Sequence, residues 1–423
     1  ALTELFNELG SEVRDDDIIR WYGTGANYYY VPEALCLPII MTLLVEKIET
    51  EPVEVIGRIE ELMLKHSDNR VMAAVMDYAV IVARLYEKAL SLGSLTLNTA
   101  DEYVMRYESD YCLIDQYYRQ ANETYFDIDP TCELFDTLQQ VKLRLDQNYS
   151  KLCNRINLEW TRCLKETGGM NKVHLLRQQN FYGERIKPIQ KKVVVIVSDA
   201  LRYEVAQELI GELAKSRHIA SLKAALAMLP SETKYCKPSL LPHRELKLYG
   251  KDEEQDMAVD DHILDTLQKR SEHLQAYRDG AVCVDFEEVA KYNQDKNREI
   301  FKHSLVYIFH DVIDKVGHKG NSEDIVRSCR KTIKELATVI PKIHASYNVT
   351  EVYVTSDHGF LFNDMEFKEK DKHKIEEDCL ERSTRYYLTK SKDKVNGVAK
   401  FPLGEVSGMV NANDVMVAVP EGT

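Results

Sequence analysis

The sequence lacks the paired cysteines that build redox motifs and small zinc-binding folds. It has nine cysteines, an odd number, and no CxxC pair. Scattered cysteines of this kind are typical of proteins kept in a reducing compartment. We therefore expect reduced thiols and a cytoplasmic protein. The nine are Cys36, Cys112, Cys132, Cys153, Cys163, Cys236, Cys283, Cys329 and Cys379.

The sequence also has no run that resembles a membrane-spanning segment or a secretory signal peptide. The apolar run from Leu35 to Val45 is much shorter than the roughly 20 residues of a transmembrane helix, and it contains Cys36 and Pro38. Residues 1–10 hold two acidic side chains and none of the basic ones that open a signal peptide. We expect no contact with a membrane. The chain starts at Ala1 rather than Met, and whether an upstream region is missing is left open.

Acidic residues outnumber basic ones, and the formal net charge is −14. A charge-driven grip on nucleic acid is therefore not expected. The modest basic stretches are residues 185–192 and 368–374. A phosphate ligand would need local positive charge, and bound divalent metal ions can provide it at an acidic site.

Length and composition predict a globular protein with more than one domain. The chain has 423 residues, of which 44% are hydrophobic and 29% charged. At about 100 to 200 residues per domain, two or three domains are expected. Residues 1–185 are predicted to be mainly helical, because apolar residues recur at helical spacing in 71–86 and 134–164. Whether this region forms one bundle or two sub-bundles is left open.

From residue 186 onward, short apolar runs alternate with helical patterns, which is typical of a doubly wound α/β domain. The two clearest helices are expected at Tyr203–Ala214 and Ser322–Tyr347, the second capped by Ser322 and with acidic residues in its first turn. The expected strands are Val193–Val197, Ser221–Ala227, Ala281–Phe286, Leu305–Phe309, Val352–Thr355 and Val415–Val419.

Three expected strands are followed directly by side chains that bind metal ions. Ligands of open α/β sheets gather at the carboxyl ends of the strands, so residues far apart in the sequence can meet there. This placement indicates a two-metal hydrolase. The candidate ligands are Asp199, Asp314, His318, Asp357 and His358.

Each of these candidates also has a simpler interpretation. Asp314 and His318, four residues apart, fit one ion or an ordinary charged connector. Asp357 and His358 are adjacent, so both reach one site only if the backbone turns after the strand. Asp199 is placed to serve as a helix N-cap. Two more side chains at a strand end, His310 and Asp311, are expected to support the site or to cap a helix.

A metal-activated side chain would need a hydroxyl near the ions. Thr233 follows the second expected strand, and two metal ions would lower the pKa of its hydroxyl and neutralise an attacked phosphoryl group. Ser231 is the local competitor. In most proteins a Thr or Ser shortly after Pro230 simply caps a helix.

Four motifs in order resemble those of the PglZ family. They are residues 197–204, residues 227–233 followed by 240–243, residues 314–318 and residues 355–361. PglZ proteins belong to the alkaline phosphatase superfamily and occur in bacterial BREX (bacteriophage exclusion) systems. The resemblance implies an alkaline-phosphatase-like domain over residues 186–423. The preceding helical segment, including residues 111–119, is similar to the segment before that domain in the family.

The resemblance also implies a centre for two divalent metal ions. Asp199, Asp357 and His358 would bind one ion, with Thr233 beside it as a ligand and as the nucleophile. The phospho-Thr233 intermediate would then be hydrolysed by water. Zn²⁺ suits mixed His and Asp ligands, and Mn²⁺ accepts the same set.

Asp314 and His318 would bind the second ion. The superfamily has a later histidine that completes this second site, and no histidine follows His373 in this sequence. We therefore expect that the domain is truncated at its C-terminus or that the second site is incomplete. His373 lies in a charged run and is not assigned to the site.

The activity implied by the resemblance is metal-dependent hydrolysis of a phosphate ester, a diester in preference to a monoester. Other BREX proteins would be partners, and they would present any nucleic-acid substrate to this acidic chain. The alternative is a non-catalytic BREX scaffold with a structural or vestigial metal site. A third alternative, a sulfatase or phosphoglycerate mutase, is disfavoured because those enzymes use Cys or Ser where this chain has Thr233.

Overall fold

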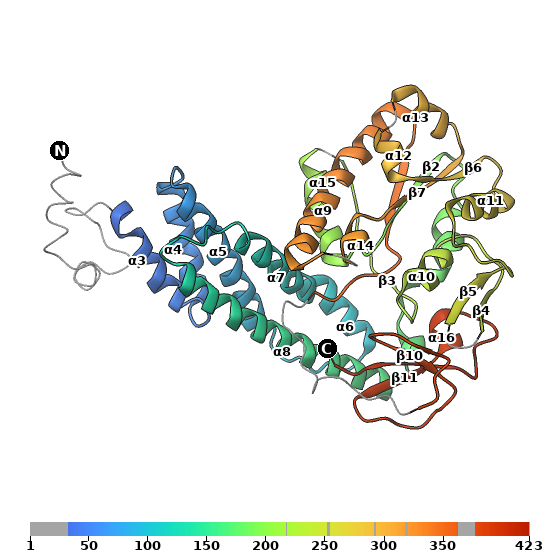
Figure 1. Ribbon diagram of the computed structural model, residues 1–423, viewed down its shortest axis with the longest axis horizontal. Coiled ribbons are helices and arrows are strands. Elements are labelled where there is room, and N and C mark those ends of the chain that lie inside the picture. The colour runs from blue at the N-terminus through green and yellow to red at the C-terminus, as the bar shows by residue number, and fades with distance from the viewer. Residues whose placement is uncertain are drawn as a thin grey trace, which may run out of the picture. The chain divides into compact units, whose positions relative to one another are not determined.

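The computed structural model describes residues 33–216, 218–251, 254–291, 293–317, 320–362 and 377–422. Helices predominate up to residue 167, and strands and helices alternate after residue 193 (Figure 1). This architecture confirms the expected mixed α/β class with a helical region before it. No helix in the described part of the chain is long and apolar enough to cross a bilayer.

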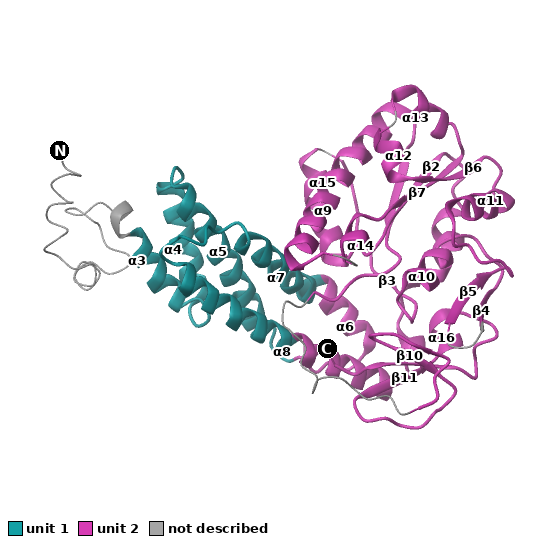
Figure 2. Ribbon diagram, viewed as in Figure 1, with its two compact units in different colours: residues 1–94, 109–152, 363–365 teal, residues 95–108, 153–362, 366–423 magenta. Residues whose placement is uncertain are grey.

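The chain divides into two compact units, coloured separately in Figure 2. The first includes residues 33–94 and 109–152, and the second includes residues 95–108 and the described residues from 153 onward. One helix, α8, continues from the first unit into the second, and the expected boundary at residue 186 stays a prediction. The helices of the first unit are α3 (Glu33–Glu46), α4 (Pro52–Lys65), α5 (Arg70–Ser91), α7 (Cys112–Tyr125) and part of α8 (Phe135–Thr167).

Tyrosines pack the interior of the first unit. The rings of Tyr118 and Tyr149 stack with their centroids 3.6 Å apart. The Tyr118 hydroxyl donates to Asp146 and the Tyr149 hydroxyl to Asp115. Asp146 also accepts from Lys142 one turn earlier on α8. These tyrosines therefore combine apolar packing with a polar bond at the ring tip.

The second unit is built on a parallel sheet with strand order β6-β7-β2-β8. Every residue of β2 and β7 is buried, as expected for strands covered on both faces. In register, the last residues of β2 and β7, Ser198 and His310, lie side by side. The strands are β6 (Ala281–Asp285), β7 (Leu305–His310), β2 (Val193–Ser198) and β8 (Glu351–Thr355).

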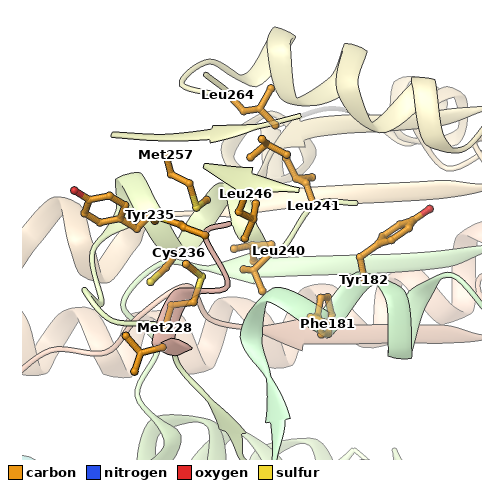
Figure 3. Close-up of a cluster of buried hydrophobic side chains, with 14 of the residues drawn as sticks. Phe181, Tyr182, Met228, Tyr235, Cys236, Leu240, Leu241, Leu246, Met257 and Leu264 are labelled. Carbon is orange, nitrogen blue, oxygen red and sulfur yellow. The ribbon is translucent and has the colours of Figure 1, made fainter. Parts of the chain in front are cut away.

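Helices cover both faces of this sheet, which is the doubly wound arrangement (Figure 1). Val194 and Ile196 of β2 pack in one hydrophobic cluster with α9 (Tyr203–Lys215) and α15 (Ser322–Tyr347). Val193, Val195 and Val197 point to the other face and pack with α10 (Thr233–Ser239) and α11 (Leu267–Tyr277). Figure 3 shows part of this second cluster, including Tyr235 and Cys236 of α10.

Two of the expected strands do not join the central sheet. The run 221–227 contains only the short β3 (Ala225–Leu226), which pairs with β1 (Leu176–Arg177). The run 415–419 falls largely in β12 (Met416–Pro420), which belongs to a separate antiparallel sheet with β11 (Val398–Pro402), β10 (Tyr387–Thr389) and β9 (Glu381–Arg382). Both runs carry the apolar pattern of a strand, but their partners lie outside the parallel sheet.

The sequence pattern did not predict the hairpin of β4 (Leu246–Lys251) and β5 (Glu254–Val259). The remaining helices of the second unit are short and connect the larger elements. They are α6 (Ala100–Arg106), α12 (Phe286–Lys291), α13 (Gln294–Ile300), α14 (Val312–Gly317) and α16 (Leu403–Ser407).

The start of α15 differs by one residue from the expected cap. Asn321, rather than Ser322, is the N-cap: its side chain accepts from the Asp324 N–H at 2.9 Å. The Asp324 carboxylate accepts in return from the Asn321 N–H at 3.1 Å. This reciprocal capping box satisfies two N–H groups that the helix itself leaves unpaired.

Replacing Asn321 should therefore destabilise the protein, whereas replacing Ser322 should not. We expect Asn321→Ala to lower the free energy of unfolding by about 1 kcal/mol, the usual contribution of an N-cap side chain. Urea unfolding followed by circular dichroism measures this difference. Ser322→Ala is the matched control, and an equal loss in both variants would contradict the assigned cap.

Candidate metal centre

Asp199 is held at the turn that follows β2. Its backbone N–H donates to the His310 carbonyl at 2.7 Å, and the residue is only 2% exposed. Ala200 then adopts a left-handed conformation with φ of 59°, which is uncommon for a residue other than glycine. The N-cap of α9 is Arg202, so Asp199 is not the helix cap that the simpler interpretation proposed.

Asp357 lies two residues beyond β8 and is completely buried. Its Oδ1 atom accepts from the backbone N–H groups of His358 at 2.9 Å and Ala200 at 3.3 Å. The other oxygen, Oδ2, has no hydrogen-bond partner among the described residues, and the same is true of Asp199 Oδ1. Two buried carboxylate oxygens are thus left without donors, which is costly unless a cation lies near them.

His358 turns toward the same place as its neighbour Asp357, because the chain leaves the strand before residue 357. Its Nδ1 atom is 2.8 Å from the Gly359 carbonyl, an acceptor, so Nδ1 carries the proton of the neutral ring. In this tautomer the Nε2 atom is unprotonated, so it can accept a hydrogen bond or bind a metal ion. This atom lies 3.3 Å from Asp199 Oδ1 and 3.8 Å from Asp357 Oδ2.

Thr233 brings a hydroxyl to this cluster from the first residue of α10. Its Oγ1 atom is 2.8 Å from His358 Nε2. The N-cap of the helix is Glu232, whose carboxylate accepts from Ser383 Oγ at 2.8 Å and from the Tyr386 hydroxyl at 2.9 Å. Ser231, the competing hydroxyl, is exposed. Thr233 is therefore the hydroxyl that the fold places at the cluster.

The pKa shifts in the cluster reflect two carboxyl groups that are buried close together. The pKa of Asp357 is raised to about 7, first by burial and then by the nearby Asp199 carboxylate, against the opposing effects of His358 and Lys237. For His358, burial is the largest effect and lowers the pKa. Asp357, the Gly359 carbonyl, Asp199 and Asp314 together outweigh it, so the pKa of His358 is raised. A bound cation would relieve the repulsion between the acids.

The spacing of these atoms suits a bound metal ion. Ligand atoms of Asp199, Asp357 and His358 all lie within 4.8 Å of one another. Zinc with ligands at about 2.0 to 2.2 Å places its ligand atoms about 3.3 to 3.6 Å apart. Asp199 Oδ1 and Asp357 Oδ2 lie 3.3 Å and 3.8 Å from His358 Nε2, which is close to these values. Thr233 Oγ1, 2.8 Å from the same nitrogen, would supply a fourth ligand atom.

Comparison with known proteins gives this cluster a family context. Residues 181–423, more than half of the chain, match the family model of the BREX system PglZ alkaline phosphatase-like domain. The chain belongs to the PglZ family. Its second unit is therefore built around an alkaline phosphatase-like domain, a fold that usually binds metal ions.

Two curated relatives extend the similarity. The alkaline phosphatase-like protein PglZ of Bacillus cereus (strain H3081.97) is 24% identical over 355 residues, covering 80% of this chain and 40% of the relative. The alkaline phosphatase-like protein BrxZ of Escherichia coli O9:H4 (strain HS) is 31% identical over 223 residues, covering 50% of this chain and 25% of the relative. The chain thus spans less than half the length of either protein.

The second expected metal site of the PglZ domain is only partly visible. Asp314 lies on α14, half-buried, and it is close enough to His358 to raise the pKa of that ring. Its expected partner His318 lies outside the described residues, so this pair stays a prediction. Gly320 lies just before α15. A Cβ at this position would lie 2.8 Å from the Cβ of Asp324, so glycine permits the close approach of residue 320 to the helix.

His310 and Asp311 lie beside the cluster rather than in it. His310 is buried, with Nδ1 3.0 Å from Ser198 Oγ and Nε2 3.1 Å from a carboxylate oxygen of Glu335 on α15. Asp311 pairs with Lys315 one turn along α14. His310 thus supports the backbone that carries Asp199, because its carbonyl accepts the Asp199 N–H.

Two residues at the centre were missed by sequence reasoning. The first is Lys237, whose ammonium contacts Asp199 Oδ2 and lies 3.9 Å from Asp357 Oδ2. It is four residues after Thr233, so the two side chains project from the same face of α10. This spacing was the signal that could have identified it.

The second is Gln178, a buried residue far earlier in the chain. Its side-chain amide donates to the backbone carbonyls of Ser356 and Asp357 and accepts from the Met228 N–H at 3.1 Å. Gln178 therefore joins the loop that carries Asp357 to the segment that leads to Thr233. No sequence pattern singled it out, because these contacts are with backbone atoms far away in sequence.

Removing the Gln178 amide should loosen the metal centre. We expect Gln178→Leu to weaken zinc binding by about tenfold, as is usual when a residue that orients metal ligands is lost. Competition with a chromogenic chelator measures the affinity. Gln179→Leu is the control, and an unchanged affinity in Gln178→Leu would show that the loop holds its position without this side chain.

Proposed function

We propose that this chain carries a metal-dependent phosphohydrolase site of a BREX phage-defence protein, with Thr233 as the nucleophile. The observation that carries the proposal is the placement of the Thr233 hydroxyl 2.8 Å from His358 Nε2, beside two buried carboxylates with unpaired oxygens. Asp199, Asp357, His358 and Thr233 would hold one divalent ion, Zn²⁺ or Mn²⁺.

In the proposed reaction Thr233 forms and loses one covalent bond to phosphorus. The Thr233 hydroxyl gives its proton to solvent, its oxygen bonds to phosphorus, and the bond to the leaving alkoxide breaks. The alkoxide takes up a proton from solvent and leaves as the alcohol. Water then hydrolyses phospho-Thr233 and restores the hydroxyl. The bound metal ions would lower the hydroxyl pKa and offset the negative charge of the phosphoryl group. Asp314 and His318 are proposed ligands of a second ion.

We propose a phosphodiester rather than a monoester as the substrate. A monoester carries an additional negative charge that calls for further cations at the site. The two lysines of α10 beside Thr233 are both paired with carboxylates: Lys234 with Glu381 at 2.5 Å, and Lys237 with Asp199. This pairing favours the less charged diester. Because the chain is acidic, a nucleic-acid diester would be presented by other BREX proteins, in the cytoplasm.

One observation favours a non-catalytic scaffold as the second candidate. Lys237 already gives Asp199 a positive partner, so the carboxylate pair is partly neutralised without any metal ion. A site of this kind can be retained for stability alone. In that case the metal centre would be structural or vestigial, and the domain would serve to bind other BREX proteins.

Hydrolysis of bis-p-nitrophenyl phosphate separates the two candidates. With Zn²⁺ or Mn²⁺ present, we expect activity that Thr233→Ala lowers by at least about a thousandfold, because the nucleophile is lost. Thr233→Ser should keep part of the activity, and Ser231→Ala should keep nearly all of it. The bound metal is counted in every variant.

Activity that survives Thr233→Ala, or that is unaffected by a chelator, would contradict the proposed mechanism. The same measurement on p-nitrophenyl phosphate tests the preference for a diester. If neither substrate is hydrolysed with either metal while the protein still binds metal ions, the scaffold becomes the better interpretation.

A further inference from the structure

Lys237 places a positive charge inside the carboxylate pair of the candidate metal centre. Its side chain is 11% exposed, and those of Asp199 and Asp357 are 3% and 0% exposed. The Lys237 ammonium contacts Asp199 Oδ2 and lies 3.9 Å from Asp357 Oδ2. Buried lysines are rare unless they are paired, so this placement calls for a physical explanation.

Charge balance provides that explanation. Two carboxylates buried next to each other repel, and each loses the hydration that it has in water. A lysine between them offsets part of this cost in the absence of a metal ion. Breaking such a buried pair is strongly destabilising, because the remaining charge is left without a partner.

The two oxygens of Asp199 face different partners. Oδ2 contacts the Lys237 ammonium, and Oδ1 lies 3.3 Å from His358 Nε2, on the side of the candidate metal ligands. Lys237 therefore leaves the ligand side of Asp199 open. The ammonium nevertheless stays within a few ångströms of any cation bound there, and like charges at that distance repel.

We propose that the Lys237 ammonium neutralises part of the negative charge of Asp199 and Asp357 before a metal ion binds. The same positive charge lowers the affinity of the centre for the metal ion. The inference deepens the proposed function, because it rests on the metal centre assigned there. It concerns metal affinity and metal-free stability, and it does not require that the site hydrolyses anything. Lys237 is a positioning residue that acts through Asp199.

Metal affinity is the first test. We expect Lys237→Met, which keeps the length of the side chain and removes its charge, to bind Zn²⁺ at least tenfold more tightly than the unmodified protein. Competition with a chromogenic chelator at one fixed pH gives the dissociation constants. Lys237→Arg keeps the charge and should stay within a few-fold of the unmodified protein.

Lys234→Met is the matched control. Lys234 lies on the same helix and is also paired with a buried carboxylate, but its partner is Glu381 rather than a metal ligand. We expect its zinc affinity to stay within about twofold of the original. Adding Asp199→Asn to Lys237→Met should abolish the gain in affinity, because the proposed effect acts through Asp199.

Thermal unfolding with a chelator present is the second readout. Lys237→Met should unfold at a lower temperature than the unmodified protein, and saturating Zn²⁺ should raise its unfolding temperature by more. If Lys237→Met does not fold without metal, it is prepared with Zn²⁺ and its rate of zinc loss to a chelator is compared. We then expect slower loss than from the unmodified protein.

The inference is overturned if Lys237→Met binds Zn²⁺ with equal or lower affinity, loses zinc as fast as the unmodified protein, or unfolds no earlier in chelator. It is also overturned if neither protein binds a divalent metal ion. These outcomes are separate from those of the proposed function. Tighter zinc binding by Lys237→Met, in a protein without phosphodiesterase activity, supports the inference and contradicts the proposed hydrolase. Thr233-dependent hydrolysis by the unmodified protein, with an unchanged zinc affinity in Lys237→Met, supports the hydrolase and contradicts the inference.

Discussion

The burial of two carboxylates at neighbouring strand ends is the constraint on which the candidate site depends. Asp199 and Asp357 are almost completely enclosed, and each keeps one oxygen without a hydrogen-bond donor among the described residues. When both acids are ionised, such a pair needs positive charge beside it. Three groups can provide this charge: His358, Lys237 and a divalent cation. The chemistry of the site depends on which of them contacts each carboxylate oxygen.

Strands, a turn and a helix of the second unit hold the two carboxylates in place. The parallel strands β2 and β8 bring the two acids to one edge of the sheet. The left-handed Ala200 turns the chain and donates its N–H to Asp357, which fixes one oxygen and leaves the other toward the site. Gln178 ties the Asp357 loop to the segment before α10, and α10 brings both Thr233 and Lys237.

Membership of the PglZ family places these residues in an alkaline phosphatase-like domain, and the two candidate functions use the same cluster differently. In a hydrolase, the acids and His358 hold the ion that activates Thr233. In a scaffold, the same acids need only a neutralising partner, which Lys237 already supplies. Metal binding alone would therefore not distinguish the two candidates, because a scaffold can hold an ion without any Thr233-dependent turnover.

The α/β class and the core strands expected at 193–197, 281–286, 305–309 and 352–355 could be predicted from the sequence, because buried strands are local patterns. The polar residues that end them are local as well, so a meeting of Asp199, Asp357 and His358 could also be expected. Which strands join the central sheet could be seen only in the fold, because β3 and β12 pair with strands outside that sheet. The tertiary structure also decided that Lys237 and Gln178 belong to the centre. Their roles come from contacts across the fold with Asp199 and with backbone carbonyls. The four-residue spacing from Thr233 places Lys237 on the same face of α10, but it does not say which acid the ammonium meets.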